Sequence, residues 1–324
     1  MVNLIRMGIV GAVFFLHAFA APAEEDTMEY EVPEYSKQYG RYHVSASGGT
    51  QQLDEHILKL FLRKEYKMNF PMSARPRAGQ IVQIVADLCM GLHDYSPIKG
   101  QQERWDFAQA LRHGMAEFMT YQPLTWDGGA DAEAFAEFKN HIADMSRHAV
   151  DGLNEFFGDE ELEGEYQRYY KDPRIDVPVT LFLDYASEDR QIDLKCSLPL
   201  RNPPKKDGSR TWRVPKPKTE PTPQQVMQQA VYHKSTGLTP GLLFVTSAGY
   251  NIVTAENCEA LQPDRLEEAY EDVVRRWLAV QKLMQAANGN WKELFSLVPP
   301  DFGMIATRHG GEILKIAKDA WRTA

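Results

Sequence analysis

Cysteine is scarce in this sequence of 324 residues, which contains only Cys89, Cys196 and Cys258 and has no Cys-x-x-Cys pair. An odd number of widely spaced cysteines excludes a disulfide scaffold. It also excludes a zinc or iron–sulfur site built from four cysteines of this chain. We therefore expect free thiols that behave as small hydrophobic side chains, and no iron–sulfur cluster.

An excess of positive charge is also lacking, because 36 Lys and Arg residues stand against 45 Asp and Glu residues. The formal net charge is -9 and the isoelectric point is near 5.5. Such a chain does not coat nucleic acid through bulk charge, although a local basic patch can still contact phosphates.

The N-terminal apolar run, Gly8 to Ala20, is too short to span a bilayer comfortably, and no membrane association is expected. With Arg6 before it and a small-residue site at 21–23 after it, the run has the pattern of a secretory signal. The alternative is that residues 1–27 precede the true start and that translation begins at Met28. The pattern alone favours export, whereas the chemistry inferred below favours the later start.

The residues that are present predict a mixed α/β (α+β) protein. Apolar residues recur at helical spacing in the segments 53–61, 79–92, 103–119, 131–157 and 264–287. Short segments rich in Tyr, Val, Ile and Leu predict strands at 163–170, 177–186, 190–198, 240–247 and 250–255. We therefore expect a mainly helical region at 28–157, a core at 158–262 and a helical region at 263–324.

A further helix is predicted after a proline-rich, basic loop at 200–221. Thr222 has the features of an N-cap, proline follows at the first helical position, and Gln225 occupies the capping-box position. Gly237 predicts the end of this helix.

The stretch 183–196, LDYASEDRQIDLKC, predicts a hairpin in which Asp184 lies opposite Asp193. Residues that face each other in an antiparallel pair have Cβ atoms about 4.5 to 5.5 Å apart, so the carboxylates repel each other. A shared proton, a nearby cation or a divalent metal must neutralise them. Lys195 follows Asp193 by two positions and therefore projects from the same face of the strand.

Two acids and a base on one sheet surface suit the hydrolysis of phosphodiesters. A hard cation such as Mg2+ or Mn2+ binds carboxylate oxygens and leaves positions for water and phosphate. A lysine beside it can orient the attacking water or offset the charge that develops on the phosphate.

Four elements in this order resemble the PD-(D/E)XK nuclease superfamily: Asp184, Asp193-Leu194-Lys195 on strands, and Gln228 and Tyr232 on a following helix. The Gln-x-x-x-Tyr element is similar to that of the RecB-like and phage-type exonuclease branch. The resemblance covers residues 160–255 well and residues 45–95 more weakly. It implies a restriction-endonuclease-like mixed central sheet flanked by helices at 158–262, with a helical N-terminal region.

The resemblance also implies roles for single residues. Asp184 and Asp193 would ligate the metal with the backbone carbonyl of Leu194, and Lys195 would be the catalytic lysine. Gln228 and Tyr232 would line the site and hold DNA or the lysine.

Two further ligands are implied less directly. The family's Gly-x-x-Val-His element is matched by residues 79–83, where Gln83 replaces the histidine and could ligate only through its amide oxygen. An upstream acid is expected in many members, and Glu165 is favoured over Glu163.

The basic loop leaves the strand of Lys195 and returns in the helix of Gln228, so we expect it to bind DNA. Its candidate phosphate contacts are Lys205, Lys206, Arg210 and Arg213, and Trp212 is expected to stack on a base. The alternative is a solvated loop that contacts no ligand.

These features predict a metal-dependent DNA nuclease, an exonuclease in preference to an endonuclease, in phage-type recombination or DNA processing. Its expected partners are DNA and a single-strand annealing or recombination protein, and its expected location is the cytoplasm, that of the host if a phage encodes it. A catalytically inactive DNA-binding module on the same fold is an alternative. Another is an exported protein whose acidic hairpin only binds metal.

Overall fold

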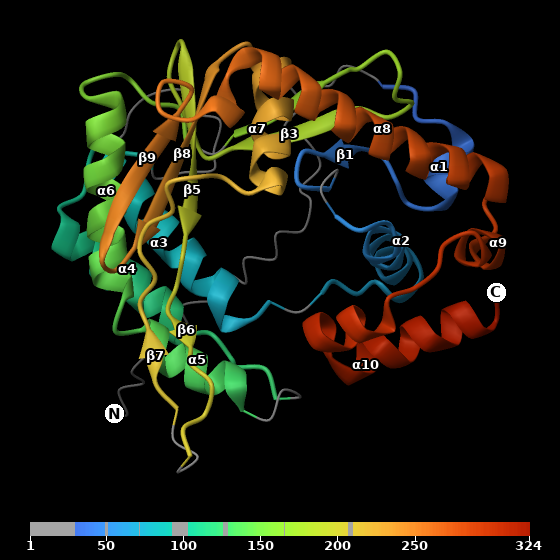
Figure 1. The fold of residues 1–324 in the computed structure, drawn as a ribbon, viewed down its shortest axis with the longest axis horizontal. Coiled ribbons are helices and arrows are strands. Elements are labelled where there is room, and N and C mark those ends of the chain that lie inside the picture. The colour runs from blue at the N-terminus through green and yellow to red at the C-terminus, as the bar shows by residue number, and fades with distance from the viewer. Residues whose placement is uncertain are drawn as a thin grey trace, which may run out of the picture. The chain divides into compact units, whose positions relative to one another are not determined.

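The computed structural model describes residues 30–48, 51–70, 72–92, 103–125, 129–164, 166–206 and 210–324. Residues 32–324 form one compact unit, whose elements are shown in Figure 1. The signal-like segment 1–27 and the alternative start at Met28 lie outside the described residues. Among the described helices, none is long and apolar enough to cross a membrane.

The chain combines helices with small sheets, which confirms the mixed α/β class. The strands are β1 (Val44–Ser45), β2 (Tyr166–Tyr170), β3 (Val179–Leu183), β4 (Tyr185–Ala186), β5 (Arg190–Cys196), β6 (Leu200–Arg201), β7 (Trp212–Arg213), β8 (Thr239–Thr246) and β9 (Gly249–Thr254). The helices are α1 (Glu34–Gln38), α2 (Leu53–Phe61), α3 (Ala74–Met90), α4 (Phe107–Met119), α5 (Ala130–Phe138), α6 (Ile142–Phe157), α7 (Pro223–Thr236), α8 (Pro263–Ala287), α9 (Trp291–Ser296) and α10 (Phe302–Arg322). A π-helical turn, η2 (Leu62–Tyr66), continues α2, and a 3-10 turn, η3 (Glu259–Leu261), precedes α8.

The strands form a four-stranded sheet of order β4-β5-β8-β9, a three-stranded sheet of order β1-β3-β2, and the pair β6-β7. β5 and β8 are parallel, whereas β4 and β9 run antiparallel to their neighbours. Parallel neighbours require a crossover connection, and α7 lies within it. Both ends of α7 match the prediction: the Thr222 capping box is formed, and Gly237 ends the helix at a φ of 76°.

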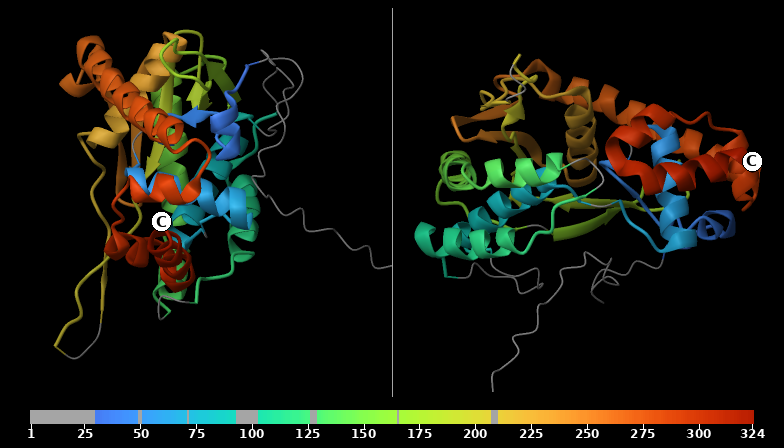
Figure 2. Two further views of the ribbon diagram at one scale, coloured as in Figure 1. Left: turned by 90° about the vertical axis from the view of Figure 1, so that its right-hand side faces the viewer. Right: turned by 90° about the horizontal axis from the view of Figure 1, so that it is seen from below.

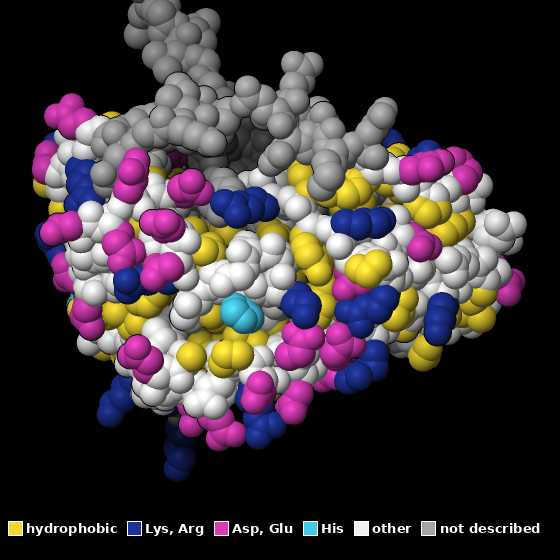
Figure 3. All heavy atoms as spheres, turned by 90° about the horizontal axis from the view of Figure 1, so that it is seen from above, with side chains coloured by type: hydrophobic (Ala, Val, Ile, Leu, Met, Phe, Trp, Pro, Cys, Tyr) yellow, Lys and Arg dark blue, Asp and Glu magenta, His cyan; other side chains and the backbone are white. Residues whose placement is uncertain are grey.

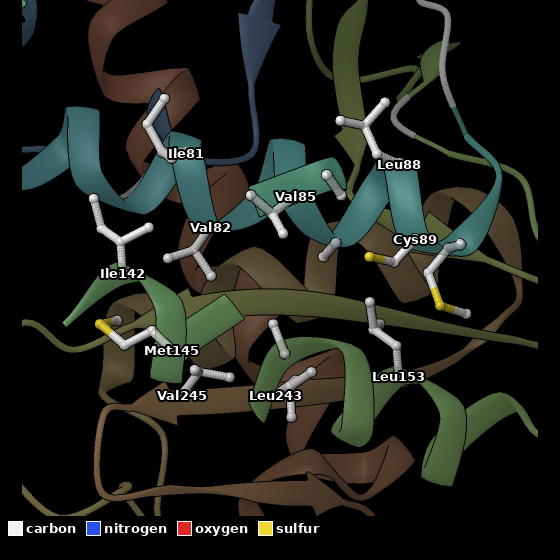
Figure 4. Close-up of a cluster of buried hydrophobic side chains, with 14 of the residues drawn as sticks. Ile81, Val82, Val85, Leu88, Cys89, Ile142, Met145, Leu153, Leu243 and Val245 are labelled. Carbon is white, nitrogen blue, oxygen red and sulfur yellow. The ribbon is translucent and has the colours of Figure 1, made fainter. Parts of the chain in front are cut away.

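β8 is apolar on both faces because helices cover the four-stranded sheet on both sides. Leu243 and Val245 pack against α3 and α6, as Figure 4 shows for the side chains of this cluster. Leu242 and Phe244, which alternate with them, pack against α7 and α8. A strand buried on both faces has an unbroken apolar sequence, as PGLLFVT does.

Gly152 allows α6 to approach this sheet closely. A Cβ atom at this position would lie 2.5 Å from a methyl carbon of Leu243, which is shorter than two side chains tolerate. The helix that carries Gly152 is shorter than predicted, because 131–157 is divided between α5 and α6. His141 lies in the break, where Nδ1 bonds the Ser247 hydroxyl and Nε2 bonds Glu137.

Segments far apart in the sequence meet beside this sheet. Leu58 of α2 and Leu62 pack with Ile305, Ile313 and Ala317 of α10, and the views in Figures 1 and 2 agree that α2 and α10 lie side by side. The C-terminal helices therefore stabilise the N-terminal ones through a shared apolar core.

Basic side chains gather near α2, where Arg41 is buried and its basic neighbours are partly buried. Arg41 is 1% exposed, and its three guanidinium nitrogens have no hydrogen-bond partner among the described residues. Burial lowers the pKa values of His43, His56, Lys59 and Arg63, and nearby arginines lower those of the first three further. We call these residues, Arg41 included, the cationic cluster.

Candidate active site

The predicted opposition of Asp184 and Asp193 follows from the register of β4 and β5. Tyr185 pairs with Ile192 and Ala186 pairs with Gln191, so the next position along the ladder places Asp184 across from Asp193. The hairpin itself is shorter than predicted, since β3 pairs with β1 and β2 in the other sheet. Asp184 therefore occupies the junction between the two sheets.

The carboxylate of Asp184 is held from two sides. Its Oδ2 accepts a hydrogen bond of 2.8 Å from the backbone N–H of Leu194. Burial, then the charge of Asp193 and a hydrogen bond to it, hold the pKa of Asp184 well above the ordinary value. A proton or a cation between the two carboxylates relieves their repulsion.

Lys195 places a positive charge beside the two carboxylates. Its Nζ forms an ion pair with Oδ2 of Asp193, which is 2% exposed. Burial lowers the pKa of Lys195, but Asp193 and Asp184 outweigh it, so the pKa lies above the ordinary value. The lysine is therefore fully protonated in this structure.

The helix α7 fixes the position of the lysine. Nζ of Lys195 donates to Oε1 of Gln228 over 3.0 Å, and Nε2 of Gln228 donates to Oη of Tyr232 over 2.8 Å. The hydroxyl of Tyr232 donates to the carbonyl of Phe182 over 2.7 Å. These bonds connect β5, α7 and β3, and they bring together five predicted residues: Asp184, Asp193, Lys195, Gln228 and Tyr232.

These five residues and Leu194 line a pocket of about 280 Å³. Gln83 of α3 lines it too, at the position where the resemblance implies a histidine. Hydroxyl groups of Ser45, Ser47 and Thr180 complete one side. A larger cavity of about 770 Å³ is lined by Phe302 and Trp321 on the C-terminal helix and contains none of the acidic residues considered above.

Two atoms at this pocket are buried without a hydrogen-bond partner in the described structure, Nε2 of Gln83 and Oγ1 of Thr180. Buried polar atoms are normally bonded, so an unpaired one needs an explanation. A half-turn of the Gln83 amide exchanges its nitrogen and its oxygen, and it would put Oε1 at the position that Nε2 occupies in the pocket.

The donor set fits a hard divalent cation. Two carboxylates, a carbonyl and an amide oxygen are the ligands that Mg2+ accepts, and they leave positions for water and phosphate. Within the described ranges, no group of three or more His, Cys, Asp or Glu side chains could hold a metal, so the described residues supply no third acid or histidine there. The predicted upstream acid, Glu165, lies outside the described residues.

Sequence reasoning missed two glutamines at this site. Gln229 donates through Nε2 to Oδ2 of Asp193 over 3.3 Å, and it accepts from Nε2 of Gln191 over 2.7 Å. Both glutamines are fully buried. The signal was present for Gln191, which alternates with Asp193 and Lys195 along β5.

The basic loop contains one short strand pair and is otherwise without helix or strand in its described part, as a proline-rich loop is expected to be, and we call it the arm. β6 and β7 pair at its base, and Arg201 forms an ion pair with Glu133 of α5. In Figure 1 the arm extends beyond the C-terminal end of β5 and beside α5. The predicted phosphate contacts all have exposed side chains: Lys205, Lys206, Arg210 and Arg213.

Trp212 differs from these cations in its surroundings. Its ring packs edge-on against Phe138, with 5.8 Å between the ring centroids, at the margin of the apolar core. The residue is half-buried, so only part of the indole is open to a base. The surface seen in Figure 3 has acidic and basic side chains interspersed, as expected for a chain of net charge -9.

Comparisons of the chain with protein-family models, curated proteins and solved structures found no match.

Proposed function

We propose that the protein is a metal-dependent DNA nuclease with a restriction-endonuclease-like core of the PD-(D/E)XK type. One observation carries this proposal: Asp184, Asp193 and Lys195 meet in one pocket, where Gln228 holds the lysine against the acids. Burying two carboxylates together costs stability. A functional requirement explains why this cost is tolerated, so their pairing supports a catalytic site.

Each residue of the pocket has its own role in this proposal. Asp184 and Asp193 would hold Mg2+ or Mn2+, with the Leu194 carbonyl and the amide oxygen of Gln83 as neutral ligands. The bound cation supplies Lewis-acid stabilisation of the charge that develops on the phosphate. Lys195 orients the attacking water or donates to a phosphate oxygen, and Gln228 keeps its Nζ beside Asp193.

The arm supports nucleic acid as the substrate. Its exposed cations are Lys205, Lys206, Arg210 and Arg213, and in the described structure none of them forms an ion pair. Exposed, uncompensated cations on the segment that joins β5 to α7, the two elements that carry most of the pocket's functional side chains, suit a polyanionic substrate. We extend the proposal to exonuclease action in phage-type recombination, in the cytoplasm, together with a single-strand annealing protein.

The test uses purified protein with end-labelled linear DNA and closed circular DNA, with and without Mg2+. We expect linear DNA to be degraded only with Mg2+ and circular DNA to be spared. Cleavage of both forms would indicate an endonuclease. DNA binding without any cleavage, in Mg2+ or Mn2+, would instead support an inactive DNA-binding module, in which Gln83 in place of a histidine prevents metal use.

A matched control is available on the same hairpin. Asp189 lies in the exposed turn, and among the described residues its carboxylate interacts with Arg190 alone. Asp189→Asn removes the same charge as Asp193→Asn but should cleave at the wild-type rate. Equal loss in both variants would contradict the site assignment.

A further inference from the structure

Two neighbouring glutamines on α7 contact the acid and the base of one strand. Gln191, Asp193 and Lys195 alternate along β5 and face α7, whereas Ile192 between them packs toward α3 and α6. Gln228 bonds Lys195, and the next residue, Gln229, bonds Asp193.

The direction of these bonds is determined by chemistry. An ionised carboxylate only accepts hydrogen bonds, so Gln229 must direct its NH2 group at Asp193. Its oxygen then faces Gln191, which must in turn donate through its own NH2 group. A rotated Gln229 amide would set its oxygen against the carboxylate of Asp193 and its NH2 group against that of Gln191, so both neighbours oppose the rotation.

The arrangement carries a cost that points to a role. Oε1 of Gln191 is buried and has no hydrogen-bond partner in the part of the chain that the structure describes. An unsatisfied buried acceptor destabilises a protein, because the atom loses its hydrogen bonds to water and gains none in return. An apolar pair would avoid this cost, so the stability of the core alone does not account for these glutamines.

We propose that Gln229, held in orientation by Gln191, is a positioning residue that fixes the carboxylate of Asp193 for cation binding. This inference rests on the proposed nuclease function of the same site. Gln229 and Lys195 both bond Oδ2 of Asp193, so neither of them occupies Oδ1, and a cation between Asp193 and Asp184 would replace the hydrogen bond that these two acids share. The two donors thus select which oxygen of Asp193 acts as a ligand.

The test is a direct titration of Mn2+ without DNA, by calorimetry, on wild type, Gln229→Met and Gln191→Met. Methionine matches glutamine in length and cannot donate. Loss of a bond to a metal ligand typically weakens metal binding by about 10- to 100-fold, and we expect a rise of this size in the Mn2+ Kd of Gln229→Met. Gln191→Met keeps the bond to Asp193 but frees the amide, so its Kd should rise by a smaller factor.

Gln224→Met is the matched control, since Gln224 is exposed on the first turn of α7. Its Mn2+ Kd should equal that of wild type. A folded Gln229→Met protein with the wild-type Kd would overturn the inference. If Gln229→Met does not fold, Gln191→Met decides in the same way, because an unchanged Kd there overturns it too.

The outcome separates this inference from the proposed function. Wild-type protein that binds Mn2+, loses affinity on Gln229→Met and still cleaves no DNA would retain the positioning role and overturn the nuclease. Cleavage at an unchanged half-saturating Mn2+ concentration in Gln229→Met would overturn the positioning role and retain the nuclease. Failure of the wild type to bind Mn2+ would overturn the positioning role.

Discussion

The active-site pocket and the cationic cluster bury charge in opposite ways. In the pocket each charged group has a partner: Lys195 meets Asp193, and Asp184 accepts from a backbone N–H and bonds Asp193. In the cationic cluster Arg41 is equally buried, yet no described residue bonds its guanidinium. Burial of charge is tolerated where hydrogen bonds and opposite charge compensate for lost hydration, and is costly elsewhere.

The pKa values show the same contrast. In the pocket, carboxylates raise the pKa of Lys195 against the effect of burial. In the cationic cluster, burial lowers the pKa of Arg41 to about 10, and Tyr35 and Asp176 only partly oppose it. The pocket stabilises the charged form of Lys195, whereas the surroundings of Arg41 destabilise its charged form.

The largest expected effect is on catalysis in the pocket. Asp184→Asn should reduce DNA cleavage by at least about 100-fold, since general acid–base and metal-site residues contribute on this scale or above. The melting temperature should be unchanged or higher, because one of two opposed carboxylates loses its charge while Asn can still accept from Leu194. Cleavage assays and thermal melts of the same preparation test both parts; a variant of wild-type activity would contradict the role of Asp184.

Removal of the pocket's cation should instead destabilise the fold. Lys195→Ala leaves Asp193 buried without its ion-pair partner, and breaking a buried pair costs about 3 to 5 kcal/mol. Urea denaturation at neutral pH measures the loss in free energy of unfolding. If Lys195→Ala is as stable as wild type, the ion pair does not compensate the acids, and the contrast with the cluster fails.

The arm provides a third arrangement, in which cations are exposed and need no partner. Replacing Lys205, Lys206, Arg210 and Arg213 by Ser should make the slope of log K against log[salt] shallower by roughly two to four units on DNA. The binding assay would use Ca2+ in place of Mg2+, and the loss should be similar for all sequences because phosphate contacts carry no base information. An unchanged slope would show that DNA is held elsewhere.

Neutralising the buried cation of the cluster should have a smaller effect of the opposite sign. Arg41→Met removes a buried charge that no hydrogen bond in the described structure satisfies and that Asp176 only partly offsets, so we expect a gain in stability where packing is kept. Chemical denaturation of Arg41→Met beside Arg308→Met, whose parent arginine is half-exposed and paired with Glu55, measures the difference. A loss of stability on Arg41→Met would mean that the cluster is compensated after all.

The last prediction concerns the pH dependence that His56 confers on stability, which is small for each unit of pH. Burial, then Arg41, Lys59 and Arg63, lower the pKa of His56 to about 3. The unfolded chain then binds more protons between pH 3 and the ordinary value near 6.5, so this contribution to stability is complete above 6.5 and is lost as pH falls. Relative to His56→Gln, the free energy of unfolding of the wild type should fall by at most about 1.4 kcal/mol for each pH unit in that window. Urea titrations at several pH values measure it, and equal pH dependence of the two proteins would refute this prediction.

Local chemistry made several elements predictable from the sequence. The capping box of Thr222 and the stop at Gly237 are formed by neighbouring residues, and both ends of α7 were predicted correctly. The opposition of Asp184 and Asp193 follows from the turn between them, and it holds in the structure.

Long-range choices were not predictable in this way. β3 pairs with β1 and β2 rather than extending the hairpin, because its partners come from distant segments that local patterns do not identify. Glutamine is usually exposed to solvent on a helix, so the sequence does not distinguish Gln229 from a surface residue. Only the packing of α7 on β5 reveals its bond to Asp193. Arg41 is similarly indistinguishable in sequence from an exposed arginine until its burial is known.

The position of the arm within the β5–α7–β8 unit bears on how the protein could evolve. The arm joins β5 and α7, and these two elements carry the acid Asp193, the lysine Lys195 and the glutamines Gln191, Gln228 and Gln229. The parallel pairing of β5 with β8 holds β5 in place. Lengthening a loop costs little closure entropy, about 0.6 kcal/mol for each doubling. Insertions, deletions or an exchanged tip in the arm should therefore alter substrate preference while the geometry of the acids, the lysine and the glutamines is inherited unchanged.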